Sequence, residues 1–179
     1  FALSGILEGA RRRLDAVGVV VVGFLAAFGG GTLRDLLLDQ RPFFWVRHVE
    51  LLWGVLALCV LAMLFLRGRH VEVTERSMQW PDALGLGLFT ATGAHHALML
   101  DMPGIVAVLM GLITGVAGGV LRDVVCNQIP SAFSDHRPYA VCAFVGGWVY
   151  VLLWWVAAPG WLALVACVGV TAGLRGLAL

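Results

Sequence analysis

The chain has 179 residues, of which 60% are apolar and 13% are charged, and its formal net charge at pH 7 is +1. A typical soluble domain is about 45–50% apolar and about 25% charged, and a domain of this length has too little interior to bury so much apolar surface. The composition therefore excludes a soluble domain and predicts an all-α polytopic membrane protein. The small net charge gives no indication of nucleic-acid binding.

Apolar segments predict seven membrane-spanning helices, because a helical span needs about 20 residues. The first segment, residues 1–8, is too short to span, so the start of the first helix is expected to lie outside the sequence. Residues 67–81 form a long polar connection and are expected to separate two halves. The six other spans are expected at residues 16–38, 51–66, 82–100, 104–126, 139–157 and 161–179.

A sequence repeat defines the expected architecture. Arg34 and Arg122 are 88 residues apart (122 − 34), and the same offset aligns further identical residues without a gap. Each copy holds three spans, so the second copy must enter the membrane from the opposite side, as in an inverted repeat. We therefore predict one membrane domain over residues 1–179, with repeats at 1–66 and 82–157 and a seventh helix at 161–179. Other aligned pairs are Gly5/Gly93, Gly23/Gly111, Gly30/Gly118, Gly31/Gly119, Asp35/Asp123, Gln40/Gln128 and Pro42/Pro130.

The distribution of arginine between the connections predicts the orientation of the chain. Arg41 and Arg47 are the two arginines in connections on one side, and cytoplasmic loops are enriched in basic residues. The N-terminus is therefore expected outside and the C-terminus in the cytoplasm. Eight arginines fall on the expected cytoplasmic side: Arg11, Arg12, Arg13, Arg67, Arg69, Arg76, Arg137 and Arg175.

A glycine cluster interrupts the second span and recurs in the fifth. Glycine in a helix costs about 1 kcal/mol relative to alanine. In membrane helices glycines allow a second helix to approach closely, or they allow a helix to break where it lines a cavity. Because the cluster is doubled and each copy precedes a charge pair, we expect the second and fifth helices to be broken there, with carbonyl groups that attract a cation. The glycines are Gly29, Gly30, Gly31, Gly118 and Gly119.

An arginine and an aspartate follow each glycine cluster inside the apolar sequence. A charged side chain in lipid costs at least about 2.5 kcal/mol, so Arg34-Asp35 and Arg122-Asp123 are expected to control charge in a pore or at its gate. Neighbouring residues on a helix point about 100° apart, so each charge is expected to pair with another span rather than with its neighbour. The alternative is a structural ion pair that holds helix ends together.

Besides the charged residues, hydroxyl side chains near the glycines are candidates for a polar path through the protein. Either they line a polar path or they bond back to carbonyl groups of their own helix. The four cysteines lie in or beside apolar runs and are expected to be buried thiols, and His95, His96 and Asp101 lack the arrangement of a metal site. We expect no metal, no cofactor and no enzyme activity. The candidate hydroxyls are Ser4, Thr32, Thr92 and Thr114.

The doubled motif resembles that of a known family. Residues 29–35 (GGGTLRD), 118–123 (GGVLRD) and 127–130 (NQIP) are similar to the bacterial branch of the trimeric intracellular cation (TRIC) channel family, whose domain is also called a glycine transporter. The resemblance implies a multi-pass homotrimer in the lipid of the bacterial inner membrane, in which each subunit has its own pore for potassium and other monovalent cations such as sodium. It also implies that residues 29–31 and 118–119 kink the second and fifth helices at the pore. Ala117 replaces a third glycine in the second motif, which implies two unequal kinks.

The residues and the resemblance leave a second function open. An alternating-access transporter of a small zwitterion such as glycine also uses inverted repeats and interrupted helices. In such a carrier an arginine of the motif would hold the carboxylate and an aspartate would hold the amine. A third interpretation, a membrane scaffold, predicts no ion flux and tolerance of Arg34→Ala or Arg122→Ala.

Overall fold

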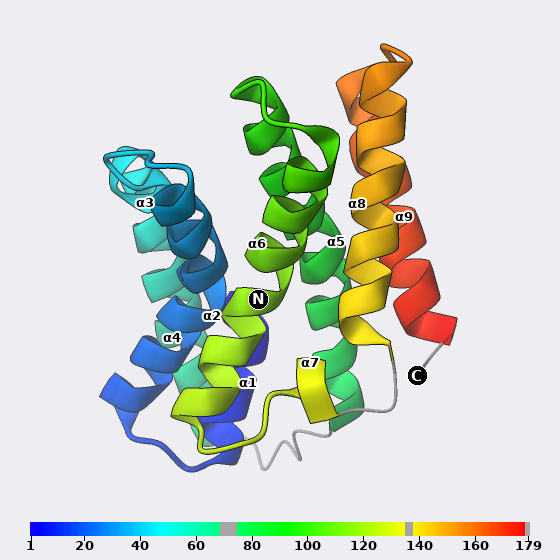
Figure 1. Ribbon diagram of the computed structural model, residues 1–179. Helices are drawn as coiled ribbons and strands as arrows, with labels where there is room; N and C mark the ends of the chain where they lie inside the picture. The colour runs from blue at the N-terminus through cyan, green and yellow to red at the C-terminus, as the bar shows by residue number, and fades with distance from the viewer. Residues whose placement is uncertain (69–74, 135–137, 178–179) are drawn as a thin grey trace.

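The computed structural model describes residues 1–68, 75–134 and 138–177, and helices and short turns account for these ranges (Figure 1). Two of the described helices have four residues each, and the others are longer. In chain order they are α1 (Ala2–Arg11), α2 (Ala16–Leu37), α3 (Phe44–Arg47), α4 (Val49–Gly68), α5 (Glu75–Met99), α6 (Gly104–Val125), α7 (Ser131–Ser134), α8 (Tyr139–Trp155) and α9 (Gly160–Leu177).

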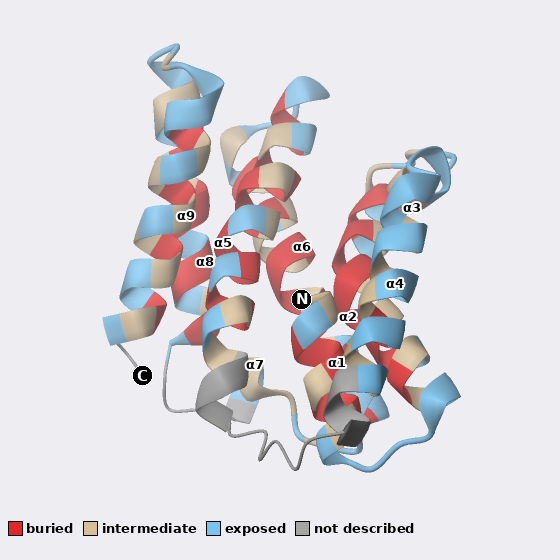
Figure 2. Cartoon of the chain, turned by 180° about the vertical axis from the view of Figure 1, so that it is seen from behind, coloured by how far each residue is buried: buried red, intermediate tan, exposed pale blue. Residues whose placement is uncertain are grey.

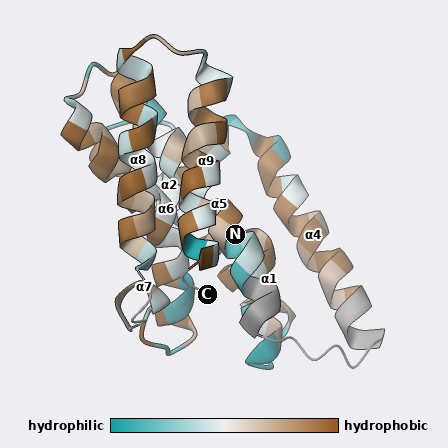
Figure 3. Ribbon diagram, turned by 90° about the vertical axis from the view of Figure 1, so that its right-hand side faces the viewer, coloured by the Kyte–Doolittle hydropathy of each residue, from teal (hydrophilic) through white to brown (hydrophobic). Residues whose placement is uncertain are grey.

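The outside of the helix bundle is apolar, as lipid requires. Helices α2, α6 and α9 are long and apolar enough to cross a membrane, and α4 and α8 contain shorter apolar segments. Large apolar side chains such as Trp53 and Leu64 are more than two-thirds exposed. Figure 3 shows hydrophobic residues along most of the helices and hydrophilic residues toward their ends. The chain is a membrane protein.

The repeat offset reappears in the helix boundaries. Helix α2 begins at Ala16 and ends at Leu37, and α6 begins and ends 88 residues later in each case (104 − 16 and 125 − 37). Helices α1 and α5 end with the same offset (99 − 11). Figures 1 and 2 show α2 and α6 side by side and running in opposite directions, and the two helices are in contact.

The turns after the helices also follow the offset. In a Schellman motif, the residue just after a helix adopts a left-handed backbone and two backbone hydrogen bonds close the helix end. Five non-glycine residues have a positive φ among the described ranges, and each is in such a motif. Two pairs of them are 88 residues apart (101 − 13 and 127 − 39), so the same turn is built twice from different side chains. The five residues are Arg13, Asp39, Asp101, Asn127 and Ala157.

Buried residues gather on the central helices. In Figure 2 they lie mostly on α2, α5 and α6, whereas α4 shows a largely exposed face. Helix α9 packs against α5 and α8. The cysteines are free and buried, which confirms the prediction of buried thiols; they are Cys59, Cys126, Cys142 and Cys167.

One predicted helix boundary and two predicted loops differ from the structure. Helix α5 begins at Glu75 rather than at residue 82, and Pro81 lies inside it. Hydropathy marks only the part of a helix that lipid surrounds, whereas residues 75–79 contain good helix formers that extend the helix beyond it. The connections expected as loops also contain the short helices α3 and α7. Part of the expected polar connection, residues 69–74, lies outside the described residues.

Candidate functional site

The glycine clusters lie where α2 crosses α6. A Cβ added at Gly30 would collide with the backbone carbonyl of Thr114, and a Cβ added at Gly118 would lie 2.5 Å from the carbonyl oxygen of Ala26. The repeat offset relates these two contacts, because Thr114 follows Ala26 by 88 residues (114 − 26), as Gly118 follows Gly30 (118 − 30). These glycines therefore let the two helix backbones touch, as small residues do in membrane proteins.

The expected helix breaks do not occur. Helices α2 and α6 continue through both glycine clusters, and no described glycine has a positive φ. The prediction that the second and fifth spans, which are α2 and α6, are broken at these glycines is therefore wrong. The carbonyl groups that a break would expose stay in the hydrogen bonds of the helices. The close helix contact offsets the cost of about 1 kcal/mol that each helical glycine carries.

The remaining glycines of the clusters have different neighbours. A Cβ at Gly29 would lie 2.5 Å from Cδ1 of Leu121, and one at Gly31 would collide with the ring of Phe44. A Cβ at Gly119 would instead meet the hydroxyl of Tyr139 at 3.6 Å, which is ordinary contact. A side chain larger than that of glycine therefore fits at position 119, and close helix packing does not require Gly119.

Arg34 pairs with the residue next to it. Its Nε and Nη2 donate to Oδ1 of Asp35 at 2.9 and 2.6 Å, and both side chains are buried. The prediction that each charge pairs with another span is wrong here, because the long arginine side chain reaches the carboxylate of its neighbour. Oδ2 of Asp35 accepts a hydrogen bond of 2.7 Å from the backbone N–H of Phe44. The pair therefore fastens the short helix α3 to the end of α2, which favours the structural alternative.

Arg122 makes the equivalent contact and more. Its Nε donates to Oδ1 of Asp123 at 2.8 Å, and Oδ2 of Asp123 accepts from the backbone N–H of Ser131 at 3.0 Å, which fastens α7. Nη1 of Arg122 also donates to Oγ of Ser4 at 2.9 Å and to Oδ1 of Asp82 at 3.0 Å. The prediction is right that this arginine pairs with another span, through Asp82, and wrong that it does not pair with its neighbour Asp123. A positive charge in the protein interior is thus shared between two carboxylates from α5 and α6.

Two further side chains complete this cluster. The hydroxyl of Tyr139 donates to Oδ2 of Asp82 at 2.6 Å. Cζ of Arg175 lies 4.7 Å from the centre of the Tyr139 ring, a cation–π contact. The Arg122 cluster, defined here as Ser4, Asp82, Arg122, Asp123, Tyr139 and Arg175, is buried and draws on α1, α5, α6, α8 and α9.

Asp82, Tyr139 and Arg175 were not among the residues predicted for the site. The repeat did not reveal Asp82, because its counterpart would precede Phe1, and Arg175 lies in the helix outside the repeat. One sequence signal was available for Asp82. A carboxylate at the edge of an apolar helix needs a partner, and a search for such isolated charges would have found it.

The candidate hydroxyls bond to their own helices. Their oxygens donate to carbonyl groups three or four residues earlier, at distances from 2.6 to 3.1 Å. Two of them also accept a bond, since Ser4 accepts from Arg122 and Thr32 accepts from Nε1 of Trp45 at 3.0 Å. This pattern agrees with the local alternative. The four are Ser4, Thr32, Thr92 and Thr114.

Comparisons with known proteins agree with this architecture. The family model described as "Glycine transporter" matches residues 1–67 and 79–155. The UPF0126 membrane protein of Vibrio cholerae is 37% identical over 147 residues, which make up 82% of this chain but 61% of that protein, so the chain spans less than two thirds of this relative. The UPF0126 inner membrane protein YadS of Escherichia coli is 36% identical over 150 residues, 84% of this chain and 72% of that protein.

A solved structure extends the likeness to the fold. The TRIC trimeric intracellular cation channel orthologue from Rhodobacter sphaeroides is similar to this chain with a TM-score of 0.91 and 33% sequence identity, over 99% of this chain and 90% of that one. Both the sequence matches and the fold therefore point to one family. The chain belongs to the bacterial branch of the TRIC channel family, whose domain is also described as a glycine transporter.

Proposed function

We propose that this chain is a subunit of a homotrimeric channel for monovalent cations, potassium among them, in the bacterial inner membrane. The Rhodobacter protein of the same fold is a trimeric cation channel, and the Escherichia coli relative is an inner membrane protein. We infer that two inverted three-helix repeats and a seventh helix form each subunit. The repeated helix boundaries and the opposite directions of α2 and α6 support this arrangement.

In this proposal each subunit carries its own ion path along the α2–α6 contact, with the glycine clusters at its narrowest part. The observation that carries the proposal is the buried Arg122 cluster at one end of this contact. Packing of the helices alone does not require two carboxylates, an arginine and a tyrosine. Apolar side chains in place of a buried ion pair often give equal or greater stability, so stability alone does not account for this cluster. A polar cluster inside a membrane protein marks a functional site by default.

We further propose that Arg122 controls charge at this end of the path, whereas Arg34 has the structural role of holding α3. A fixed positive charge repels cations, so it must be neutralised or displaced when cations pass. Asp82 and Asp123 neutralise it in the arrangement described here. A change in the Asp82–Tyr139 contact would alter this balance, because the hydroxyl of Tyr139 holds the second oxygen of Asp82.

Single-channel recording of the purified protein in planar bilayers tests the proposal. A channel gives unitary currents of many ions for each opening, and reversal potentials in potassium, sodium and chloride gradients report its selectivity. The N-terminus outside and the C-terminus in the cytoplasm are tested by labelling single cysteines introduced near each end. Saturable uptake of glycine into vesicles without unitary currents would overturn the channel and support the alternating-access transporter.

A further inference from the structure

The corner between α1 and α2 carries three consecutive arginines, Arg11, Arg12 and Arg13, here called the arginine turn. The backbone of the corner is closed by a Schellman motif, in which the N–H of Leu14 donates to the carbonyl of Gly9 and the N–H of Arg13 donates to the carbonyl of Ala10, both at 3.0 Å. The guanidinium groups therefore project from a defined corner rather than from a loose loop.

One of the three arginines holds the corner to the rest of the protein. Nε of Arg12 donates to Oε1 of the buried Glu8 at 3.0 Å. With its amide oriented to satisfy both groups, Gln128 accepts from Arg12 and donates to Glu8 at 3.3 Å, which attaches the corner to the chain just after α6. Nη1 of Arg11 lies 3.7 Å from the same Glu8. A single buried carboxylate thus serves two guanidinium groups.

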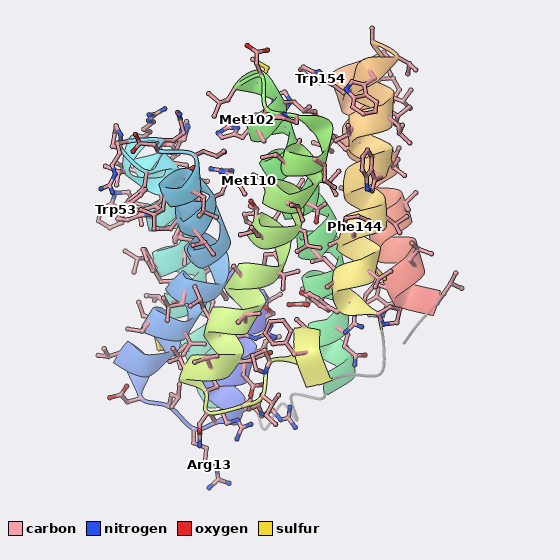
Figure 4. All side chains as sticks on the ribbon, viewed as in Figure 1. Arg13, Trp53, Met102, Met110, Phe144 and Trp154 are labelled. Carbon is pink, nitrogen blue, oxygen red and sulfur yellow. The ribbon has the colours of Figure 1, made fainter. Side chains whose placement is uncertain are left out.

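Arg13 is directed away from the helices. Figure 4 shows its side chain beyond the end of the bundle, and it is exposed. Among the described residues it has no ion-pair partner, and the nearby Asp15 is engaged in capping α2 through the N–H of Gly18 at 2.7 Å. Arg13 also has a φ of 57°, a left-handed backbone that glycine, asparagine and aspartate adopt more readily than arginine does. Helix closure therefore does not explain an arginine at this position.

The equivalent corner of the second repeat shows that the turn does not need positive charge. Met99, Leu100 and Asp101 occupy the corresponding positions, and Asp101 has a φ of 55° in the same motif. Each corner ends three residues before a helix long and apolar enough to cross a membrane, so each lies at the level of lipid headgroups. The two ends of the protein thus present corners of the same shape and opposite charge.

We propose that the arginine turn binds the phosphate of an anionic phospholipid, such as phosphatidylglycerol, in the leaflet on its side of the membrane. A guanidinium group presents paired donors that match phosphate oxygens, and arginines at a membrane surface are attracted to anionic lipid. Arg13 is the main contact and Arg11 the second, while Arg12 fixes the corner through Glu8 and Gln128.

The test compares binding of phosphatidylglycerol and phosphatidylcholine to the purified protein in detergent micelles, by thermal shift and by the lipid retained after washing. The wild type is expected to be stabilised by phosphatidylglycerol and not by phosphatidylcholine. Arg13→Gln is expected to lower the apparent affinity for phosphatidylglycerol about fivefold, and the double variant Arg11→Gln/Arg13→Gln is expected to lower it further.

Arg13→Gly separates lipid binding from folding. Glycine favours the left-handed backbone, so this variant is expected to be at least as stable as the wild type in phosphatidylcholine micelles, while its affinity for phosphatidylglycerol falls as it does in Arg13→Gln. Arg47→Gln is the matched control, because it removes one exposed arginine at the opposite end. Unchanged phosphatidylglycerol affinity in Arg13→Gly, or an equal loss in Arg47→Gln, would overturn the proposal. Equal stabilisation by inorganic phosphate would also overturn it and would indicate a site for free phosphate.

Discussion

Nη1 of Arg122 and Oδ1 of Asp82 lie 3.0 Å apart, although 40 positions separate the two residues in the sequence. This contact joins α6 to α5 inside an apolar bundle. It distinguishes Arg122 from Arg34, which shares the same sequence motif and pairs with its neighbour Asp35. The two copies of one motif therefore have different electrostatic surroundings.

The first prediction concerns stability. Asp82→Asn is expected to lower the free energy of unfolding by about 3 kcal/mol, because Arg122 would keep its buried charge with one carboxylate fewer. Thermal unfolding in detergent measures the change. Asp39→Asn is the control, since Asp39 is exposed and asparagine tolerates its left-handed backbone, so its effect is expected to be below about 0.5 kcal/mol. Equal stability of the two variants would show that the ion pair contributes little.

The second prediction separates glycines that share a cluster. Gly30→Ala is expected to destabilise the protein by about 1–3 kcal/mol, because the new methyl group collides with the carbonyl of Thr114. Gly118→Ala is expected to behave alike through the contact with Ala26. Gly119→Ala is expected to be neutral or stabilising by up to about 1 kcal/mol, since its Cβ has room and alanine favours the helix. Melting temperatures of the three variants test this order, and a destabilised Gly119→Ala would contradict it.

The third prediction concerns ion flux and rests on the proposed channel. Arg122→Gln removes the fixed positive charge and leaves Asp82 and Asp123, so cation conductance or open probability is expected to rise in single-channel recordings. Arg34→Gln is the comparison, and it is expected to change conductance less because Arg34 serves to hold α3. If Arg122→Gln lowers only the yield of folded protein and leaves the currents unchanged, Arg122 is a structural ion-pair partner.

The fourth prediction concerns the short helices. Oδ2 of Asp35 accepts from the N–H of Phe44, and a hydrogen bond to a charged group contributes about 1.5–3 kcal/mol. Asp35→Asn is therefore expected to speed hydrogen exchange of the Phe44 amide about 10- to 100-fold, as measured by mass spectrometry of peptides that cover α3. The Ser131 amide, which Asp123 holds, serves as the internal control and is expected to be unchanged in the same sample. Equal acceleration at both amides would indicate general loosening instead.

The amino-acid sequence by itself determined the class of protein and the positions of several of its long helices. Hydropathy and helix length predicted α2, α6, α8 and α9 to within about two residues, since these properties depend on the chain's local composition. The sequence predicted two copies of three spans at an offset of 88 residues, and in the structure a turn also recurs at this offset, as Asp39 and Asn127 illustrate (127 − 39).

Only the tertiary structure decided what the motif residues contact. Whether Gly30 breaks a helix or packs against Thr114 depends on where α2 crosses α6, and the same local sequence permits both. Arg122 bonds to Asp82 of another helix, and Tyr139 of a third helix bonds to Asp82, so helical spacing alone could not assign Asp82 or Tyr139 to the Arg122 cluster. The glycines and charge pairs marked the site in the sequence, but helix packing determined that the glycines are contact points and that the Arg122 cluster draws on five helices.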